Sequence, residues 1–215
     1  FSALMQVRQD GDLKHRVSYE PEQPMIDAMV ANGWRTGFGD EWIRLGATSE
    51  HTVDGSFSER TMSIRAGYPN RRDYHGNVTT KQADLDAWVE RMWRAGIQPN
   101  CHVNGDVAMD MYLTSLERAQ RLFPRRAVRP KLTHATLANP AIIARMKALD
   151  AVPACFTSYA YYNPDKFKFY GEALMEHMMP YRSYLDAGIK VAGGCDFPPG
   201  PFAPLMGIQG MVTRT

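Results

Sequence analysis

Short runs of β-prone residues alternate with longer helical patterns along this 215-residue chain. Such alternation is typical of a parallel sheet with crossover helices, because a parallel strand can return to the sheet only through a long connection. The pattern therefore predicts an α/β fold, either a doubly wound sheet or a (β/α)8 barrel. The expected strands are residues 15–19, part of 42–53, 97–103, 131–135, 151–157 and 189–194; the expected helices are residues 21–32, 79–95, 106–123, 140–149 and 172–187.

Several helix boundaries are marked by residues with known end preferences. Gly33, Gly96 and Gly188 follow the last periodic residues of three helices, and glycine adopts the left-handed conformation of a helix C-terminus without steric cost. Asn139 followed by Pro140 is typical of a helix start, because Asn caps free N–H groups and Pro fits the first turn. These signals fix where the strands between the helices must lie.

The six expected strands fall short of the eight that a barrel needs, so a barrel would require two strand–helix units outside this sequence. The pattern is also interrupted between Asp54 and Thr79, where glycines, arginines and tyrosines are frequent. A loop of this length after a strand is more often functional than a simple connection. No composition typical of a linker divides the chain, so we expect one domain over residues 1–215.

Titratable residues close four of the expected strands. Glu50 lies in the second strand, His102 ends the third, His134 ends the fourth and Asp196 ends the sixth. The carboxyl ends of parallel strands meet at one edge of a sheet, or at one mouth of a barrel, so these side chains could face one point. Imidazole and carboxylate are common ligands of zinc and similar divalent metals. The four residues together predict a metal site.

Each of these residues also has a simpler structural interpretation. A single His at a strand end is more often a hydrogen-bonded structural residue, and Asp106, directly after Gly105, fits the N-cap of the following helix. His51 should point away from Glu50, because successive side chains of a strand alternate between its faces. Cys101 and Cys195 adjoin proposed ligands and should point away from the metal for the same reason.

The composition of the chain argues against nucleic acid and membranes as binding partners. A net charge of +2, without a block of Lys and Arg, argues against nucleic-acid binding. No run approaches the about 18 apolar residues of a membrane span, and no signal peptide is visible. Cys101, Cys155 and Cys195 cannot form a closed disulfide framework, which favours a reducing, cytoplasmic compartment. We therefore expect a small-molecule substrate, and an assembly into homo-oligomers stays open.

Six short motifs resemble the metal-dependent amidohydrolase superfamily. More narrowly, they are similar to its amidohydrolase-3 group, which contains the YtcJ-like hydrolases and N-substituted formamide deformylase. The resemblance extends over residues 15–214, and its motifs are residues 54–56 (DGS), 102–106 (HVNGD), 131–135 (KLTHA), 185–189 (LDAGI), 193–198 (GGCDFP) and 204–208 (PLMGI).

The resemblance implies a (β/α)8 barrel with a metal centre at its C-terminal mouth and hydrolysis of an amide-like C–N bond by a metal-activated hydroxide. His102 and His134 match the family's histidine ligands on the fifth and sixth strands. Asp196 matches the aspartate of the eighth strand, which binds a metal and shuttles the proton. The implied cofactor is a divalent metal, zinc foremost, as one or two ions.

Two departures from the family pattern affect the metal site. Glu50 stands where such proteins commonly have a carboxylated lysine, and a glutamate can bridge two cations directly. The first-strand His-x-His pair has no counterpart, since none of the six histidines are two residues apart. The family's small β-sandwich is absent too. We therefore expect strands three to eight of an incomplete barrel, with the missing pair upstream of Phe1, and we do not expect these residues alone to fold or turn over.

Other functions remain open at this stage. Tyr159, Tyr161 and Tyr162 follow the fifth expected strand, where barrel loops contact ligands, and Tyr159 is a candidate substrate-binding residue. A Cys–His hydrolase is disfavoured, because no cysteine enters a helix, and a Rossmann dehydrogenase is disfavoured by the lack of a G-x-G-x-x-G motif. A hydrolytic deaminase and a catalytically inactive scaffold of the same fold are the remaining alternatives.

Overall fold

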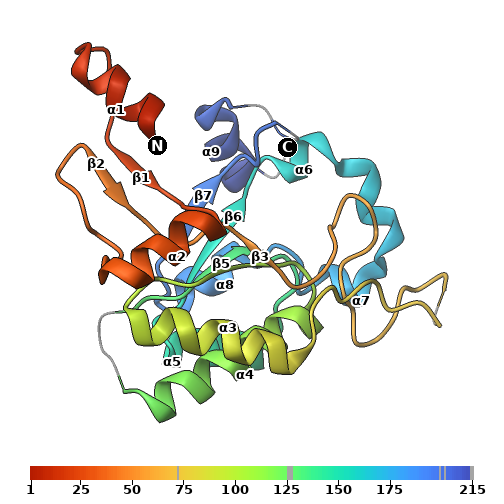
Figure 1. The fold of residues 1–215 in the computed structure, drawn as a ribbon. Helices are drawn as coiled ribbons and strands as arrows, with labels where there is room; N and C mark the ends of the chain where they lie inside the picture. The colour runs from red at the N-terminus through yellow and green to blue at the C-terminus, as the bar shows by residue number, and fades with distance from the viewer. Residues whose placement is uncertain (72, 125–127, 199, 201, 214–215) are drawn as a thin grey trace.

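Parallel strands form the centre of the fold, and helices pack around them (Figure 1). The structure is a computed structural model that describes residues 1–71, 73–124, 128–198, 200 and 202–213. Strands β1 (Val17–Tyr19) and β2 (Ile43–Leu45) form a two-stranded parallel pair. The main sheet has the order β3-β4-β5-β6-β7, and all its neighbours are parallel; its strands are β3 (His51–Thr52), β4 (Asn100–Val103), β5 (Lys131–His134), β6 (Val152–Phe156) and β7 (Ala192–Gly194). The predicted α/β class with a parallel sheet is confirmed.

The expected strand within residues 42–53 is in fact two strands that pair on opposite sides. β2 pairs with β1, whereas β3 pairs with β4. The residues between them pass from one neighbour to the other: the Gly46 N–H donates to Tyr19 O, and the Thr48 N–H donates to Gln98 O. The expected strand is therefore present as two short strands, because the change of pairing partner interrupts the ladder.

Helices α3 (Gln82–Ala95), α4 (Asp106–Leu122) and α5 (Pro140–Ala148) cover one face of the main sheet (Figure 1). Their apolar side chains pack against strand residues such as Cys101 and Leu132 in the largest buried cluster of the fold. Helix α2 (Gln23–Asn32) packs through Ile26 and Met29 in a separate cluster with α3. These helices match the predicted ranges, and Gly33 and Gly96 adopt the expected left-handed conformation at two helix ends.

The expected helix over residues 172–187 is divided into α7 (Gly171–Met175) and α8 (Tyr181–Asp186). Pro180 disfavours a helical conformation in the preceding residue, and Met179 has a left-handed φ of 49°. The Met179 N–H donates to Thr136 O at 2.6 Å, a bond that ties this break to the end of β5. Three helices and a 3₁₀ segment lie outside the predicted elements: α1 (Ser2–Gln9), α6 (Tyr159–Tyr162), α9 (Pro204–Thr213) and η1 (Pro164–Phe169).

The long segment after β3 is packed and not a surface excursion. Phe57, Met62 and Ile64 are fully buried, and they share a cluster with Tyr159 and Tyr170 from the residues after β6. An antiparallel bridge between Asp54 and Val78 closes the base of this segment. It therefore forms part of the wall at the carboxyl ends of the strands.

Eight-stranded closure is not visible among the described residues, where β1 pairs only with β2 and β7 pairs only with β6. In the same part of the chain, none of the helices combines the length and the apolar character needed to cross a bilayer.

Candidate metal centre

Glu50, His102 and His134 come together at the carboxyl ends of β4 and β5 and at the start of β3. Each contributes one potential ligand atom, and these atoms lie within 4.8 Å of one another. His134 Nε2 is 2.8 Å from His102 Nδ1 and 3.9 Å from Glu50 Oε2, and His102 Nδ1 is 3.3 Å from Glu50 Oε2. The structure thus brings together three of the four residues that the sequence predicted as metal ligands.

The His102 ring is held by the backbone of the segment after β3. Its Nε2 lies 3.1 Å from the carbonyl oxygen of Gly55, which can only accept a hydrogen bond. When Nε2 carries the proton and donates to this carbonyl, the Nδ1 lone pair faces His134 and Glu50. Histidine ligands of metals usually donate their other ring N–H in this way, because the bond fixes the tautomer and the orientation of the ring.

His134 is buried and stays neutral. Burial lowers the pKa of His134 well below its usual value, and the nearby charges of His102 and Lys131 lower it further. The opposite holds for His102: burial lowers its pKa, but the hydrogen bonds with Glu50 and Gly55 and the charges of Asp54 and Glu50 outweigh burial and raise it overall. A neutral imidazole has a free lone pair, so His134 is in the form that binds metals.

Asp196 lies outside this three-residue group and contacts Tyr159 instead. The Tyr159 hydroxyl donates to Asp196 Oδ2 at 2.5 Å, and the Tyr159 ring lies 6.3 Å from the His134 ring between centroids. Burial raises the pKa of Tyr159, and the hydrogen bond with Asp196 raises it further, so the hydroxyl keeps its proton. Tyr159 therefore contacts Asp196 and also lies near His134, whereas Tyr161 and Tyr162 are exposed.

The neighbours of the predicted ligands follow strand alternation. His51 points away from Glu50 and stacks on Trp88 of α3, with ring centroids 4.5 Å apart. Cys101 is fully buried beneath the helices, and burial raises its pKa, as it raises the pKa of Cys155 to about 12. The expectations for His51 and Cys101 are confirmed, and the one for Cys195 stays a prediction. Thiols with raised pKa values are poor nucleophiles, which agrees with the argument against a Cys–His hydrolase.

The helix that follows β4 begins differently from the prediction. Gly105 is the N-cap residue of α4, and Asp106 is its first helical residue. The Asp106 carboxylate accepts a hydrogen bond from the backbone N–H of Arg65 at 2.9 Å. Its role is structural, as expected, but it anchors the segment after β3 and not the helix end.

Two residues that the sequence did not single out as functional support His102 from behind. Asp54 is buried next to β4, and Asn104 Nδ2 donates to Gly55 O at 3.0 Å. Burial raises the pKa of Asp54, and hydrogen bonds from Asn104, Ser63 and Gly105 oppose that effect. Their only sequence signal was membership of the DGS and HVNGD motifs, because a supporting residue has no ligand-type pattern of its own.

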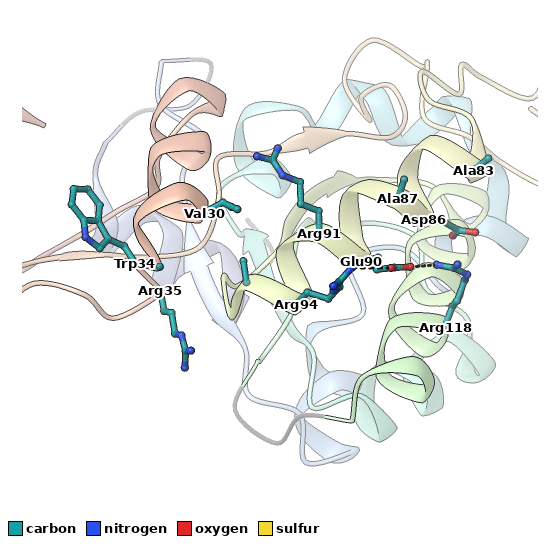
Figure 2. Close-up of a pocket in the computed structure, with 12 residues that line it drawn as sticks. Val30, Trp34, Arg35, Ala83, Asp86, Ala87, Glu90, Arg91, Arg94 and Arg118 are labelled. Atoms are coloured by element: carbon teal, nitrogen blue, oxygen red, sulfur yellow. Dashed lines mark hydrogen bonds and ion pairs between the residues drawn. The ribbon is translucent and has the colours of Figure 1, made fainter.

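A separate concavity of about 780 Å³ lies over α2, α3 and α4 (Figure 2). None of the three clustered ligands lines it. Its arginines are largely paired: Arg118 contacts Glu90 at 2.8 Å, as Figure 2 shows, and Arg91 contacts Asp27 at 2.5 Å. The convergent imidazole and carboxylate groups make the strand ends the stronger candidate for chemistry.

Known proteins resemble this chain in sequence. The sequence model described as "Amidohydrolase family" matches residues 1–215. A protein of Bacillus subtilis (strain 168) that is named as an amidohydrolase, YtcJ, is 27% identical over 166 residues, which are 75% of this chain and 30% of that protein.

Two crystal structures share the fold. An uncharacterized metal-dependent hydrolase from Pyrococcus furiosus superimposes with a TM-score of 0.83 at 21% identity and covers 100% of this chain and 44% of its own. An uncharacterized metal-dependent hydrolase from Pyrococcus horikoshii OT3 gives a TM-score of 0.85 at 19% identity, with 99% and 42% covered. The chain thus spans less than half the length of the relatives that it matches.

Proposed function

Since this chain belongs to the amidohydrolase family, we propose that the protein is a metal-dependent hydrolase that cleaves an amide-like carbon–nitrogen bond of a small molecule. The observation that carries the proposal is the convergence of His102 Nδ1, His134 Nε2 and Glu50 Oε2 within 4.8 Å. His102 Nδ1 lies within hydrogen-bond distance of both His134 Nε2 and Glu50 Oε2, and a divalent metal would accept a lone pair from all three atoms at once.

Glu50, His102 and His134 would hold the metal, for which zinc is the first candidate, because two imidazoles and a carboxylate are its common donor set at catalytic sites. A metal of this kind, when bound, would lower the pKa of a water toward about 7 and would polarise a carbonyl oxygen. The donor set fits this role: the His134 ring is neutral, and the Gly55 carbonyl fixes the orientation of the His102 ring.

Asp196 would move the proton from the attacking water to the leaving nitrogen. Its carboxylate accepts a hydrogen bond from the Tyr159 hydroxyl at 2.5 Å, which orients Oδ2. In this arrangement Tyr159 serves the substrate side of the centre as a binding residue and also positions Asp196. We also propose that Asp196 binds the metal as a fourth ligand.

The parallel strands are proposed to be the third to eighth strands of a (β/α)8 barrel. The segment 43–52 would then be one barrel strand that pairs with β1 through β2 and with β4 through β3. The relatives are more than twice as long as the matched region, which is consistent with further strands in the complete protein. Cys101, Cys155 and Cys195 are free thiols, which supports a reducing, cytoplasmic location.

Metal analysis of the full-length protein tests the proposal. Elemental analysis should find a bound divalent metal, and the His102→Ala and His134→Ala variants should lose it, because each change removes one of three convergent donors. His15→Ala is a matched control, since His15 lies outside the cluster. A full-length protein that holds no zinc, iron or manganese, and that gains no activity when metal is added, would favour the inactive scaffold.

The role of Asp196 is tested by Asp196→Asn. An amide has nearly the shape of the carboxylate but cannot carry the proton, so turnover should fall by about 10²-fold or more while metal content stays largely unchanged. Steady-state kinetics with a metal assay on the same samples separates the two effects. Retained turnover would place the proton carrier on another residue.

A further inference from the structure

Asp54 is a buried carboxylate that accepts four hydrogen bonds, and the proposed reaction has no use for it. Its side chain is close to β4, and the residue is 1% exposed. Oδ1 accepts from the Asn104 N–H at 2.8 Å, and Oδ2 accepts from the N–H groups of Gly105 and Ser63 at 2.8 Å and from the Ser63 hydroxyl at 2.9 Å. The carboxylate thereby joins the end of β4, the start of α4 and the segment after β3.

Gly105 allows the end of β4 to approach the segment after β3, and Gly55 allows a close approach within that segment. A Cβ on Gly105 would lie 1.8 Å from the carbonyl oxygen of Ser63, and a Cβ on Gly55 would lie 2.3 Å from Thr61 Oγ1. Neither position tolerates a side chain without a shift of the backbone. The spacing between the segment after β3 and the end of β4 is therefore set by backbone contact, with Asp54 as the bridge across it.

The hydrogen bonds of Asp54 are linked to the His102 ring through the Gly55 carbonyl. Gly55 follows Asp54 directly, and its carbonyl oxygen lies 3.1 Å from His102 Nε2. Asn104, whose backbone is held by Asp54, donates its side-chain N–H to the same carbonyl at 3.0 Å and accepts from Thr136 Oγ1 at 2.6 Å. The position of the Gly55 carbonyl, and with it the direction of the His102 Nδ1 lone pair, depends on this buried network.

We propose that Asp54 is a positioning residue of the metal centre: it fixes the Gly55 carbonyl and Asn104, which together orient His102 for metal binding. The inference rests on the proposed metal-dependent function and deepens it. Bonds to the partners behind a histidine ligand usually change metal affinity by about 10- to 100-fold when they are lost. Asp54 would not contact His102 directly. It would act through the backbone of Gly55, whose carbonyl is the partner of the His102 ring.

A carboxylate is needed at this position because both of its oxygens accept. In Asp54→Asn, one of the two side-chain positions becomes an NH₂ group, which would face either the Asn104 N–H or the N–H groups of Ser63 and Gly105. Two N–H groups that face each other cannot form a hydrogen bond, so the new NH₂ group and the backbone N–H must move apart. The substitution keeps the volume of the side chain and still loosens one side of the bridge.

The test measures the zinc affinity of the full-length protein by competition with a chelator. We expect Asp54→Asn to bind zinc at least 10-fold more weakly than the natural protein. Ile142→Val is the matched control, because Ile142 is a buried residue of α5 and its side chain makes none of the hydrogen bonds of the network. This change should lower the melting temperature of the metal-free protein and leave zinc affinity unchanged.

Ser63→Ala provides a second variant if Asp54→Asn does not fold. It removes one of the four hydrogen bonds to Asp54 and should weaken zinc binding several-fold, less than Asp54→Asn does. Unchanged zinc affinity in the folded variant would overturn the inference, as would an equal loss in Ile142→Val. If the natural protein binds none of zinc, iron and manganese, the proposed function fails and the inference fails with it. If the natural protein binds zinc and the folded Asp54→Asn variant binds it equally well, only the inference fails.

Discussion

At the scale of the residue, the conformation of His134 determines whether the candidate centre exists. In the parallel register of β4 and β5, His134 is paired with Val103, whose side chain is buried beneath the helices. Strict alternation along β5 would send the His134 ring to that same face. The backbone of His134 instead has a φ of 72°, in the left-handed region, and the ring lies against His102. Non-glycine residues adopt this conformation at a cost, and such residues cluster at functional sites.

A second single residue, His51, should make the stability of the protein depend on pH. Burial lowers its pKa below 6.5 in the folded protein, so the unfolded chain takes up a proton first as the pH falls. The stability that His51 contributes is present above about pH 6.5 and is lost as the pH falls toward its folded pKa. We expect the melting temperature of the metal-free protein to decrease from pH 7.5 to pH 5, and His51→Gln to make that decrease shallower.

His51→Gln should remove only part of the dependence of melting temperature on pH. The pKa of His134 is lowered as well, so protonation of His134 also destabilises the folded protein as the pH falls. Thermal melts at several pH values, in the presence of a chelator, measure the effect. A slope identical in the natural protein and in His51→Gln would show that the His51 proton does not contribute.

At the scale of the element, the ends of α5 show how local sequence signals become structure. Asn139 is the N-cap, and its side-chain oxygen accepts from the Ile142 N–H at 3.0 Å. Arg145, on the same helix, binds Glu117 of α4 through Nε at 2.6 Å and also contacts Asp110. The cap is a property of the sequence, whereas the ion pairs require that α4 and α5 be neighbours.

Asn139→Ala should therefore lower the free energy of unfolding by about 1 kcal/mol, because it leaves an N–H of the first turn without its acceptor. Asn139→Asp is the matched control and should retain most of the stability, since a carboxylate caps as well as an amide. Chemical denaturation of the three proteins provides the measurement. Equal midpoints for all three would mean that the cap contributes nothing.

At the scale of the whole molecule, one end of the sheet is open and apolar among the described residues. β7 has β6 as its only strand neighbour, and the outer face of α9 exposes Leu205 by 78% and Val212 by 78%. Ile208 lies on the same helical face at three- and four-residue spacing and is 56% exposed. Exposed apolar faces and unpaired strand edges promote association between molecules.

Residues 1–215 expressed alone should consequently self-associate, as shown by light scattering during size-exclusion chromatography. Changing Leu205, Ile208 and Val212 together to lysine should reduce the apparent mass, because charged side chains would line the same face. The matched control is the same triple substitution at exposed polar positions, which should leave the apparent mass unchanged. A monomeric natural chain would contradict the expectation.

Local sequence patterns were enough to predict the parallel α/β class, most helix boundaries and the three candidate ligands that cluster. These follow from local rules: hydrophobic periodicity selects the element, glycine and Asn–Pro pairs end or begin helices, and parallel strands present their carboxyl ends at one edge. For the same reason the opposite orientations of Glu50 and His51 could be predicted from alternation alone.

How these residues meet depends on the folded chain. The change of pairing partner between β2 and β3, the left-handed turn at His134, the Tyr159–Asp196 contact and the burial of Asp54 each depend on segments far apart in the sequence. Sequence periodicity reports which face of an element is apolar, but it holds no information on which distant backbone will supply a hydrogen bond. The candidate ligands could therefore be predicted from the sequence, whereas the residues that hold them in place could be identified only from the structure.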